Sequence, residues 1–160
     1  MQTLLNTPHE IIQQNILGAA AKAKTRILNI LVLGMMAGSF IAMGAQSSSL
    51  AVHNISNIGL ARTLAGCIFP VGLMMIVFVG GELFTGDCMM SMAWMQRKIH
   101  FADMLRTLVL VYVSNFVGAA LIAFLVAHSG QYDYSSGALG AYTIKVAYGK
   151  VHLSFANALV

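Results

Sequence analysis

Three long apolar stretches, separated by polar and basic segments, dominate the pattern of hydrophobic and polar positions along this chain. Residues 27–46 and 107–127 contain no charged side chain. Residues 63–96 form the longest stretch, and its only charged side chains are Glu82 and Asp87. Because about 20 apolar residues are enough to cross a membrane, the pattern predicts an all-α membrane protein with three transmembrane helices.

The second stretch predicts a transmembrane helix that is broken by a loop. Its 34 residues exceed one span, and its centre carries the glycine-rich sequence GGELFTGD at residues 80–87. Irregular backbone at membrane depth is stable only where protein buries it or where it lines a watery cavity. We therefore expect a pathway through the membrane at this break. Glu82 is expected to bind loop amides or another segment, and Asp87 to cap the helix that follows.

The remaining segments complete a single transmembrane unit that occupies residues 1–160. Residues 7–25 begin with a capping-box sequence and predict an amphipathic helix, which either lies in the membrane interface or packs on the protein's own surface. Polar loops are expected at residues 46–57 and 128–140. A short helix and the start of a fourth span are expected at residues 141–160.

Two features of the spans predict contacts between helices. Small residues recur every four positions in the first span, at Gly34, Gly38 and Ala42. Such a stripe lets the backbone of another helix approach closely, so it predicts a packing seam rather than a transport role. Asn115, near the middle of the third span, predicts a hydrogen bond to a neighbouring helix.

Composition supports the membrane interpretation and accounts for the charge without nucleic-acid binding. The chain is 58% hydrophobic and 9% charged, whereas soluble domains carry about 25% charged residues. The net charge of +4 comes from basic residues that flank the apolar stretches, which is a pattern of membrane topology. Their distribution places the N-terminus in the cytoplasm of a plasma-membrane protein: Lys22, Lys24, Arg26, Arg97, Lys98 and Arg106 inside, and Arg62, Lys145 and Lys150 outside.

The sequence contains no pattern that is typical of covalent chemistry. Cys67 and Cys88 have no metal-ligand spacing, and the histidines flank the spans without such spacing either. No phosphate-binding loop and no Ser/His/Asp grouping occurs. We therefore expect no enzyme activity, no catalytic residue, no cofactor, no metal ion and no nucleic-acid partner.

Five short motifs, in order along the chain, resemble the formate/nitrite transporter (FNT) family. The most specific is ELFTG at residues 82–86, inside the expected break. The others lie in the three apolar stretches and near the C-terminus: AGSFI at 37–41, AGCIF at 65–69, SNFVGA at 114–119, and KVH at 150–152 followed by Phe155.

The resemblance implies the N-terminal half of a six-helix channel. Such channels are built from two inverted repeats, have an aquaporin-like shape, and assemble in the lipid membrane as homopentamers with one pore per protomer. They pass small monovalent anions such as formate, nitrite or hydrosulfide, and a proton that moves with the anion is left open here. The resemblance further implies roles for single residues. Phe69, Leu73 and Leu83 would form a pore constriction, and Thr85 and Gly86 would belong to a gating loop. Lys150 would be a cation that attracts the anion.

Two other functions also fit the residues. In an aquaporin-like pore for neutral solutes, Lys150 would only lie at the headgroup level. Independently of that choice, Phe69 and Leu73 could pack in the core or against lipid instead of lining a pore. In a non-conducting scaffold subunit, the small-residue seam would be the functional feature. The chain also lacks the family's second broken helix. We therefore expect it to belong to a longer protein, the alternative being that two chains pair.

Overall fold

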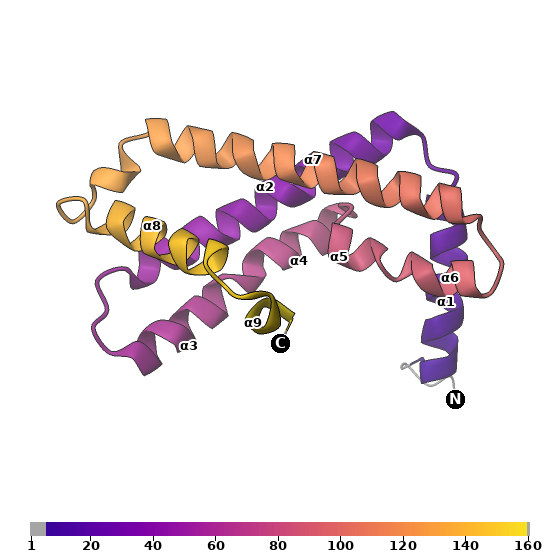
Figure 1. Ribbon diagram of the computed structural model, residues 1–160, viewed down its shortest axis with the longest axis horizontal. Helices are drawn as coiled ribbons and strands as arrows, with labels where there is room; N and C mark the ends of the chain where they lie inside the picture. Colours follow the sequence, from indigo (N-terminus) through magenta and orange to yellow (C-terminus); the bar gives the residue numbers. More distant parts are fainter. Residues whose placement is uncertain (1–5, 160) are drawn as a thin grey trace.

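Helices make up almost all of the structure, a computed structural model that describes residues 6–159 (Figure 1). No strand occurs between these residues. Helix α2 packs against α7 and against the line formed by α3 and α4, while α1 packs against α6 at one end. The elements are α1 (Pro8–Lys22), α2 (Ile27–Val52), α3 (Ile58–Ile68), α4 (Pro70–Val79), α5 (Phe84–Asp87), α6 (Met90–Met95), α7 (Phe101–His128), the 3-10 helix η1 (Gln131–Asp133), α8 (Ala138–Val151) and α9 (Phe155–Leu159).

The seam between α2 and α7 brings backbone against backbone at glycine residues. A Cβ atom added to Gly38 would lie 2.0 Å from the carbonyl oxygen of Asn115, and one added to Gly118 would lie 2.0 Å from that of Met35. Gly34 faces α7 as well. The packing seam predicted from the small residues of the first span is therefore confirmed at both glycines, and its partner is α7.

The second apolar stretch forms two consecutive helices and then breaks. Phe69 joins α3 to α4 with helical backbone angles (φ −53°, ψ −42°), so Ile58–Val79 continues as one helix of span length. Helix α4 ends at Gly80 in the left-handed conformation (φ 71°), which glycine adopts without a steric penalty. Residues 80–83 are not helical, and α5 begins directly after them. The break therefore lies in the first half of GGELFTGD.

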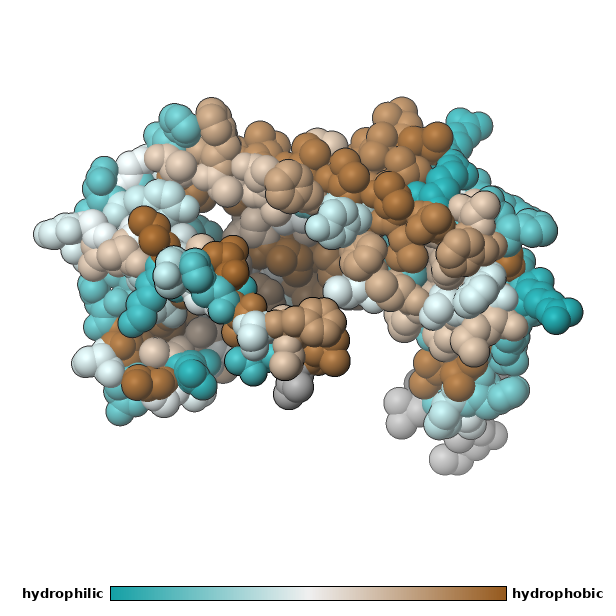
Figure 2. Space-filling model, viewed as in Figure 1, coloured by the Kyte–Doolittle hydropathy of each residue, from teal (hydrophilic) through white to brown (hydrophobic). Residues whose placement is uncertain are grey.

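Three helices are long and apolar enough to cross a membrane: Ile27–Val52, Ile58–Val79 and Phe101–His128. The chain itself covers little of them, since 28%, 11% and 17% of their most apolar windows are buried. Phe78 is 89% exposed and Phe116 is 69% exposed, and Figure 2 shows apolar residues spread along α7. Such surfaces require a membrane or further protein around them.

The first span is longer than expected because its polar side chains bind distant partners. Helix α2 runs on to Val52, through most of the segment expected as a loop at residues 46–57. The Gln46 side chain donates a hydrogen bond to Gln131 (2.8 Å), and the Ser48 hydroxyl donates one to the carbonyl oxygen of Ala65 (3.4 Å). These partners satisfy polar groups that would otherwise favour a solvated loop.

The second and third spans begin earlier than residues 63 and 107. Asn57, expected in a loop, caps α3 by accepting a hydrogen bond from the backbone N–H of Leu60 (3.0 Å). Helix α7 begins at Phe101 and carries Asp103 in its first turn, where the helix dipole favours a negative charge. A count of consecutive uncharged residues misses both starts, because a charged residue follows each of them: Arg62 in α3, and Asp103 and Arg106 in α7.

The segment after α7 is more helical than the expected loop at residues 128–140. It contains η1, and α8 begins inside it and continues beyond it. The short α9 is exposed and occupies part of the region where the start of a fourth span is expected. Val160 lies outside the described residues. The chain reverses direction before α8 at three residues with positive φ angles (56°, 59° and 85°), namely Ser135, Ser136 and Gly137.

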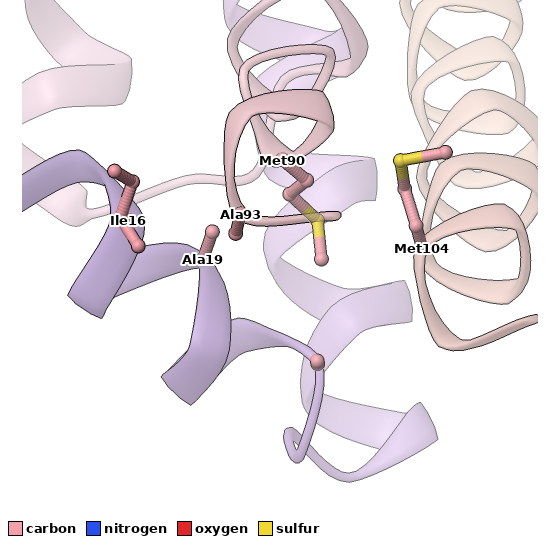
Figure 3. Close-up of a cluster of buried hydrophobic side chains, with 6 residues drawn as sticks. Ile16, Ala19, Met90, Ala93 and Met104 are labelled. Carbon is pink, nitrogen blue, oxygen red and sulfur yellow. The ribbon is translucent and has the colours of Figure 1, made fainter. Parts of the chain in front are cut away.

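Helix α1 packs on the protein's own surface through a small apolar cluster (Figure 3). Its other side stays open to the surroundings, with Leu17 70% exposed. Of the two roles open for residues 7–25, packing against the protein is therefore confirmed, and an apolar face remains for the membrane interface. The cluster consists of Ile16, Ala19 and Ala23 from α1 and its end, Met90 and Ala93 from α6, and Met104 from α7.

Candidate functional site

The break between α4 and α5 is the candidate site, and α2 holds its backbone. The N–H of Gly81 donates to the carbonyl oxygen of Ile76 (2.9 Å), which closes the end of α4. The N–H of Glu82 donates to the carbonyl oxygen of Leu33 on α2 (3.3 Å). The N–H of Gly81 is therefore satisfied by the end of α4 and that of Glu82 by α2, as buried polar groups require.

Asn115 on α7 binds both sides of the break. Its Nδ2 donates to the carbonyl oxygens of Glu82 (2.8 Å) and of Gly34 on α2 (2.8 Å). Its Oδ1 accepts a hydrogen bond from the backbone N–H of Phe84 (3.0 Å). The predicted bond from Asn115 to a neighbouring helix is confirmed. Its role in holding the break was missed, although one amide at mid-span opposite a broken helix is a usable sequence signal.

The two carboxylates of the break share one partner on the N-terminal helix. The Lys22 ammonium group forms ion pairs with Glu82 and, at 2.6 Å, with Asp87. The pairing of Glu82 with another segment is therefore confirmed. The expected capping by Asp87 is wrong: α6 has no side-chain cap, and the buried Asp87 carboxylate faces α1 instead. An N-cap stands just before the first helical turn, with extended backbone, whereas Asp87 is the last residue of α5 and its carboxylate binds Lys22 of α1.

Lys22 is half-buried and remains charged. Burial alone would lower its pKa, but the hydrogen bonds to Asp87 and Glu82 outweigh burial and raise the pKa above the ordinary value of lysine. The cluster therefore holds one positive and two negative groups, with Asp87 Oδ2 lacking a hydrogen-bond partner among the described residues. This attachment joins α1 to the break as well as to α6.

Phe69 and Leu73, proposed for the constriction, lie on one helical face across the junction of α3 and α4. Phe69 is 42% exposed and Leu73 is 48% exposed, so neither is packed into the core of this chain. Leu73 lines an apolar cavity of about 270 Å³ together with Pro70 and Val77. Their surface is open to whatever surrounds the second span.

Leu83, Thr85 and Gly86 lie at the break itself. Leu83 has extended backbone angles (φ −111°, ψ 129°) and is half-buried, while Thr85 is exposed. Gly86 lines a small cavity of about 110 Å³ with Lys22 and Asp87. This cavity differs from the one beside Leu73, so the structure of this chain does not bring the break residues and the predicted constriction pair into one cavity.

Lys150, the predicted anion-attracting residue, lies in the last turn of α8 and lines a cavity of about 650 Å³. Arg62 from α3 and Lys145 from α8 line the same cavity. Sequence analysis placed these three residues on one side of the membrane but gave a role only to Lys150. Across residues 6–159, no three side chains of His, Cys, Asp or Glu lie close enough to hold a metal ion.

Comparisons with known proteins agree with the motifs. The sequence profile described as "Formate/nitrite transporter" matches residues 9–160. The formate channel BtFdhC of Bacillus thuringiensis is 34% identical over 96% of this chain and 60% of its own length. The formate channel FocA of Escherichia coli K12 is 29% identical over 86% of this chain and 49% of its own length. The formate-nitrite transporter of Plasmodium falciparum is 30% identical over 67% of this chain and 38% of its own length.

The chain thus spans about three-fifths or less of the length of these relatives. They are named as channels and transporters, which are not enzymes. The profile covers nearly the whole chain, including the break, the seam and the three apolar helices. The chain is therefore a membrane protein and belongs to the formate/nitrite transporter family.

Proposed function

We propose that this chain builds part of a membrane channel or transporter for a small monovalent anion, with formate as the first candidate. The observation that carries the proposal is the broken second span with ELFTG at residues 82–86, in a chain of the FNT family. The relatives from Bacillus thuringiensis and Escherichia coli are named formate channels, which favours formate over nitrite and hydrosulfide.

Phe69, Leu73 and Leu83 form the narrow apolar part of the proposed pathway. Their partial exposure supports this role, because side chains that line a pathway are not consumed by core packing. A narrow apolar passage loses its water easily and forces an anion to shed its hydration shell. A neutral protonated acid meets a much smaller barrier. We therefore propose that formate crosses the constriction together with a proton.

Lys150 and the break residues serve the charged form in this proposal. A cation next to a pathway of low dielectric constant attracts an anion more strongly than it would in water. Lys150 therefore draws the anion toward the mouth. Thr85 and Gly86 form the gating position, which the exposure of the Thr85 side chain at the break supports.

The proposed assembly is a homopentamer in the plasma membrane, with this chain as one half of an inverted repeat and its N-terminus in the cytoplasm. Packing of α1 on α6 at one end of the molecule supports this topology, because Lys22 lies in the last turn of α1 and Arg97 follows the end of α6 (Figure 1). Arg62, Lys145 and Lys150 share a separate cavity. The positive-inside rule assigns the larger group of basic residues to the cytoplasmic side and these three to the other side.

Flux through lipid vesicles tests the proposal directly. The native protein is reconstituted, and the uptake of isotope-labelled formate and of glycerol is measured. We expect formate uptake without glycerol uptake, and a loss of about tenfold or more with Lys150→Glu but not with Lys150→Arg. Equal glycerol uptake would indicate a neutral-solute pore, and no uptake of either would indicate a scaffold; both results would overturn the proposal.

A second variant pair tests the constriction. Phe69→Ala widens the proposed narrow part, so glycerol should begin to pass while formate loses its dependence on a pH gradient. Phe116→Ala removes a similar ring from an exposed position on α7 and should leave both fluxes unchanged. If the two variants behave identically, the proposal that Phe69 lines the pathway is wrong.

A further inference from the structure

The cavity of about 650 Å³ between α2, α3 and α8 gathers positive charge from distant parts of the sequence. Arg62 reaches it from α3, and Lys145 and Lys150 reach it from α8, about 80 residues later. The remaining lining is mostly apolar, and it includes no aspartate or glutamate. The surface is therefore a positively charged hollow rather than a mixed polar one.

These three cations have no acidic partner within the described part of the chain, where the ion pairs found are those of Lys22. His53, which also lines the cavity, is already engaged: one ring nitrogen contacts the carbonyl oxygen of Leu50 (2.7 Å) and the other contacts the Ser135 hydroxyl (2.9 Å). The charge available to a ligand therefore comes from Arg62, Lys145 and Lys150. Three like charges around one hollow repel each other, and a bound anion relieves that repulsion.

Topology gives no reason for basic residues at this place. Arg62, Lys145 and Lys150 are the three that oppose the positive-inside distribution of the chain. Basic residues on that side of the membrane are therefore explained by some role other than topology. All three line the same cavity, which indicates a shared role there.

The position of the cavity relates it to the second span. Its lining from α3 includes Ile58, Arg62 and Ala65, which share one helical face. The same face continues four residues further at Phe69 and then at Leu73. From Arg62 to Phe69 is seven residues, or about 10 Å along a helix. The charged hollow and the proposed constriction thus lie on the same face of the second span.

We propose that Arg62 and Lys145 act together with Lys150 as an anion-collecting mouth. They raise the local concentration of a small monocarboxylate such as formate at the outer end of the pathway and so set its rate of entry. This inference rests on the proposed function, and it adds two specificity-determining residues to it. Because the residues are exposed, their attraction is screened by salt over about 10 Å at 0.1 M and over about 30 Å at 0.01 M.

The test measures initial formate uptake by the native protein in phosphatidylcholine vesicles at low and at high ionic strength. We expect the double variant Arg62→Gln/Lys145→Gln to lose about tenfold in rate at low salt, with a raised KM and an unchanged maximal rate. At high salt it should match the unmodified protein. Arg62→Lys/Lys145→Arg should retain the full rate. Lys24→Gln, an exposed basic residue at the opposite end, is the matched control and should change nothing.

Each other outcome overturns the inference in a distinguishable way. A loss that is equal at both salt concentrations, or a loss that the charge-conserving variant shares, would indicate a structural role. An unchanged rate in the double variant, with formate flux intact in the unmodified protein, would contradict the role of Arg62 and Lys145 in collecting anions but leave the proposed function. Absence of formate flux in the unmodified protein would overturn both. A loss that appears only after phosphatidylglycerol is added would assign the cluster to lipid headgroups instead.

Discussion

The side-chain amide of Asn115 donates a hydrogen bond to the backbone carbonyl oxygen of Glu82 across 2.8 Å, joining the middle of α7 to the break in the second span. The same side chain binds the carbonyl oxygen of Gly34 and the N–H of Phe84. Two of the three bonds therefore stabilise the break, where the helical ladder is interrupted, and the third joins Asn115 to α2.

Replacement of Asn115 by leucine should destabilise the protein by about 2 kcal/mol, because three hydrogen bonds are lost and backbone groups at the break are left without partners. Thermal unfolding in detergent measures the effect. Asn15→Leu is the control, since within residues 6–159 the Asn15 side chain bonds only the carbonyl oxygen of Ile11 in its own helix. Equal melting temperatures for the two variants would contradict the role of Asn115.

Replacement of Lys22 by methionine should loosen α1 from the break. The buried Asp87 and Glu82 would lose their cation, and because Lys22 is partly exposed we expect a cost of about 2 kcal/mol rather than the larger values of fully buried pairs. Hydrogen exchange of α1 and α5 should speed up. Lys24→Met, at a nearby exposed position, should leave exchange unchanged, and similar exchange in both variants would rule out the attachment.

The same ion pairs predict a pH dependence at the alkaline side. The pKa of Lys22 is raised in the folded protein, because its bonds to Asp87 and Glu82 outweigh the burial that would lower it. A raised pKa contributes stability that is complete below the ordinary lysine value of about 10.4 and is lost as pH rises through the folded pKa. The melting-temperature difference between the unmodified protein and Lys22→Met should therefore stay constant between about pH 7 and 9 and shrink above about pH 10.5. A difference that already shrinks within the lower range would contradict this assignment.

Replacement of Gly38 by alanine should separate α2 from α7. The added Cβ would lie 2.0 Å from the backbone oxygen of Asn115, and backbone cannot move aside as a flexible side chain can. We expect a loss of about 3 kcal/mol or failure to fold, measured by thermal unfolding. Gly66→Ala on α3 meets nothing within 4 Å, and it should be neutral or stabilising by up to about 1 kcal/mol. A Gly38 variant as stable as the Gly66 variant would contradict the close approach.

The break in the second span and the seam between α2 and α7 could be predicted, because each depends on residues close together in the sequence. The break was predictable because Glu82 and three glycines interrupt an apolar run, and the seam because Gly34 and Gly38 share a helical face. The continuation of α2 beyond Gln46 was not, because it depends on Gln131, 85 positions away along the chain. The same limit applies to Asp87, whose partner Lys22 is 65 positions away.

The candidate site shows the same division. Phe69 and Leu73 could be placed on one helical face from their spacing alone, whereas the roles of Thr85 and Lys150 come from the family resemblance and stay predictions. The gathering of Arg62 and Lys145 around the Lys150 cavity could not be predicted, because it requires α8 to pack on α2 and to face α3 across the cavity. The chain spans about three-fifths or less of the length of the relatives named as formate channels, so roles in a pore stay predictions.

The attachments of the break have a kinetic consequence for any motion of Thr85. Asn115 fixes the backbone at Glu82 and Phe84, and Lys22 fixes Asp87, so Thr85 lies between two restrained points. A segment restrained at both ends can rotate single peptide groups but cannot swing outward as a hinged flap. Larger displacement requires one of these attachments to dissociate first. The lifetime of the Lys22 and Asn115 contacts therefore sets an upper limit on how fast the segment can rearrange.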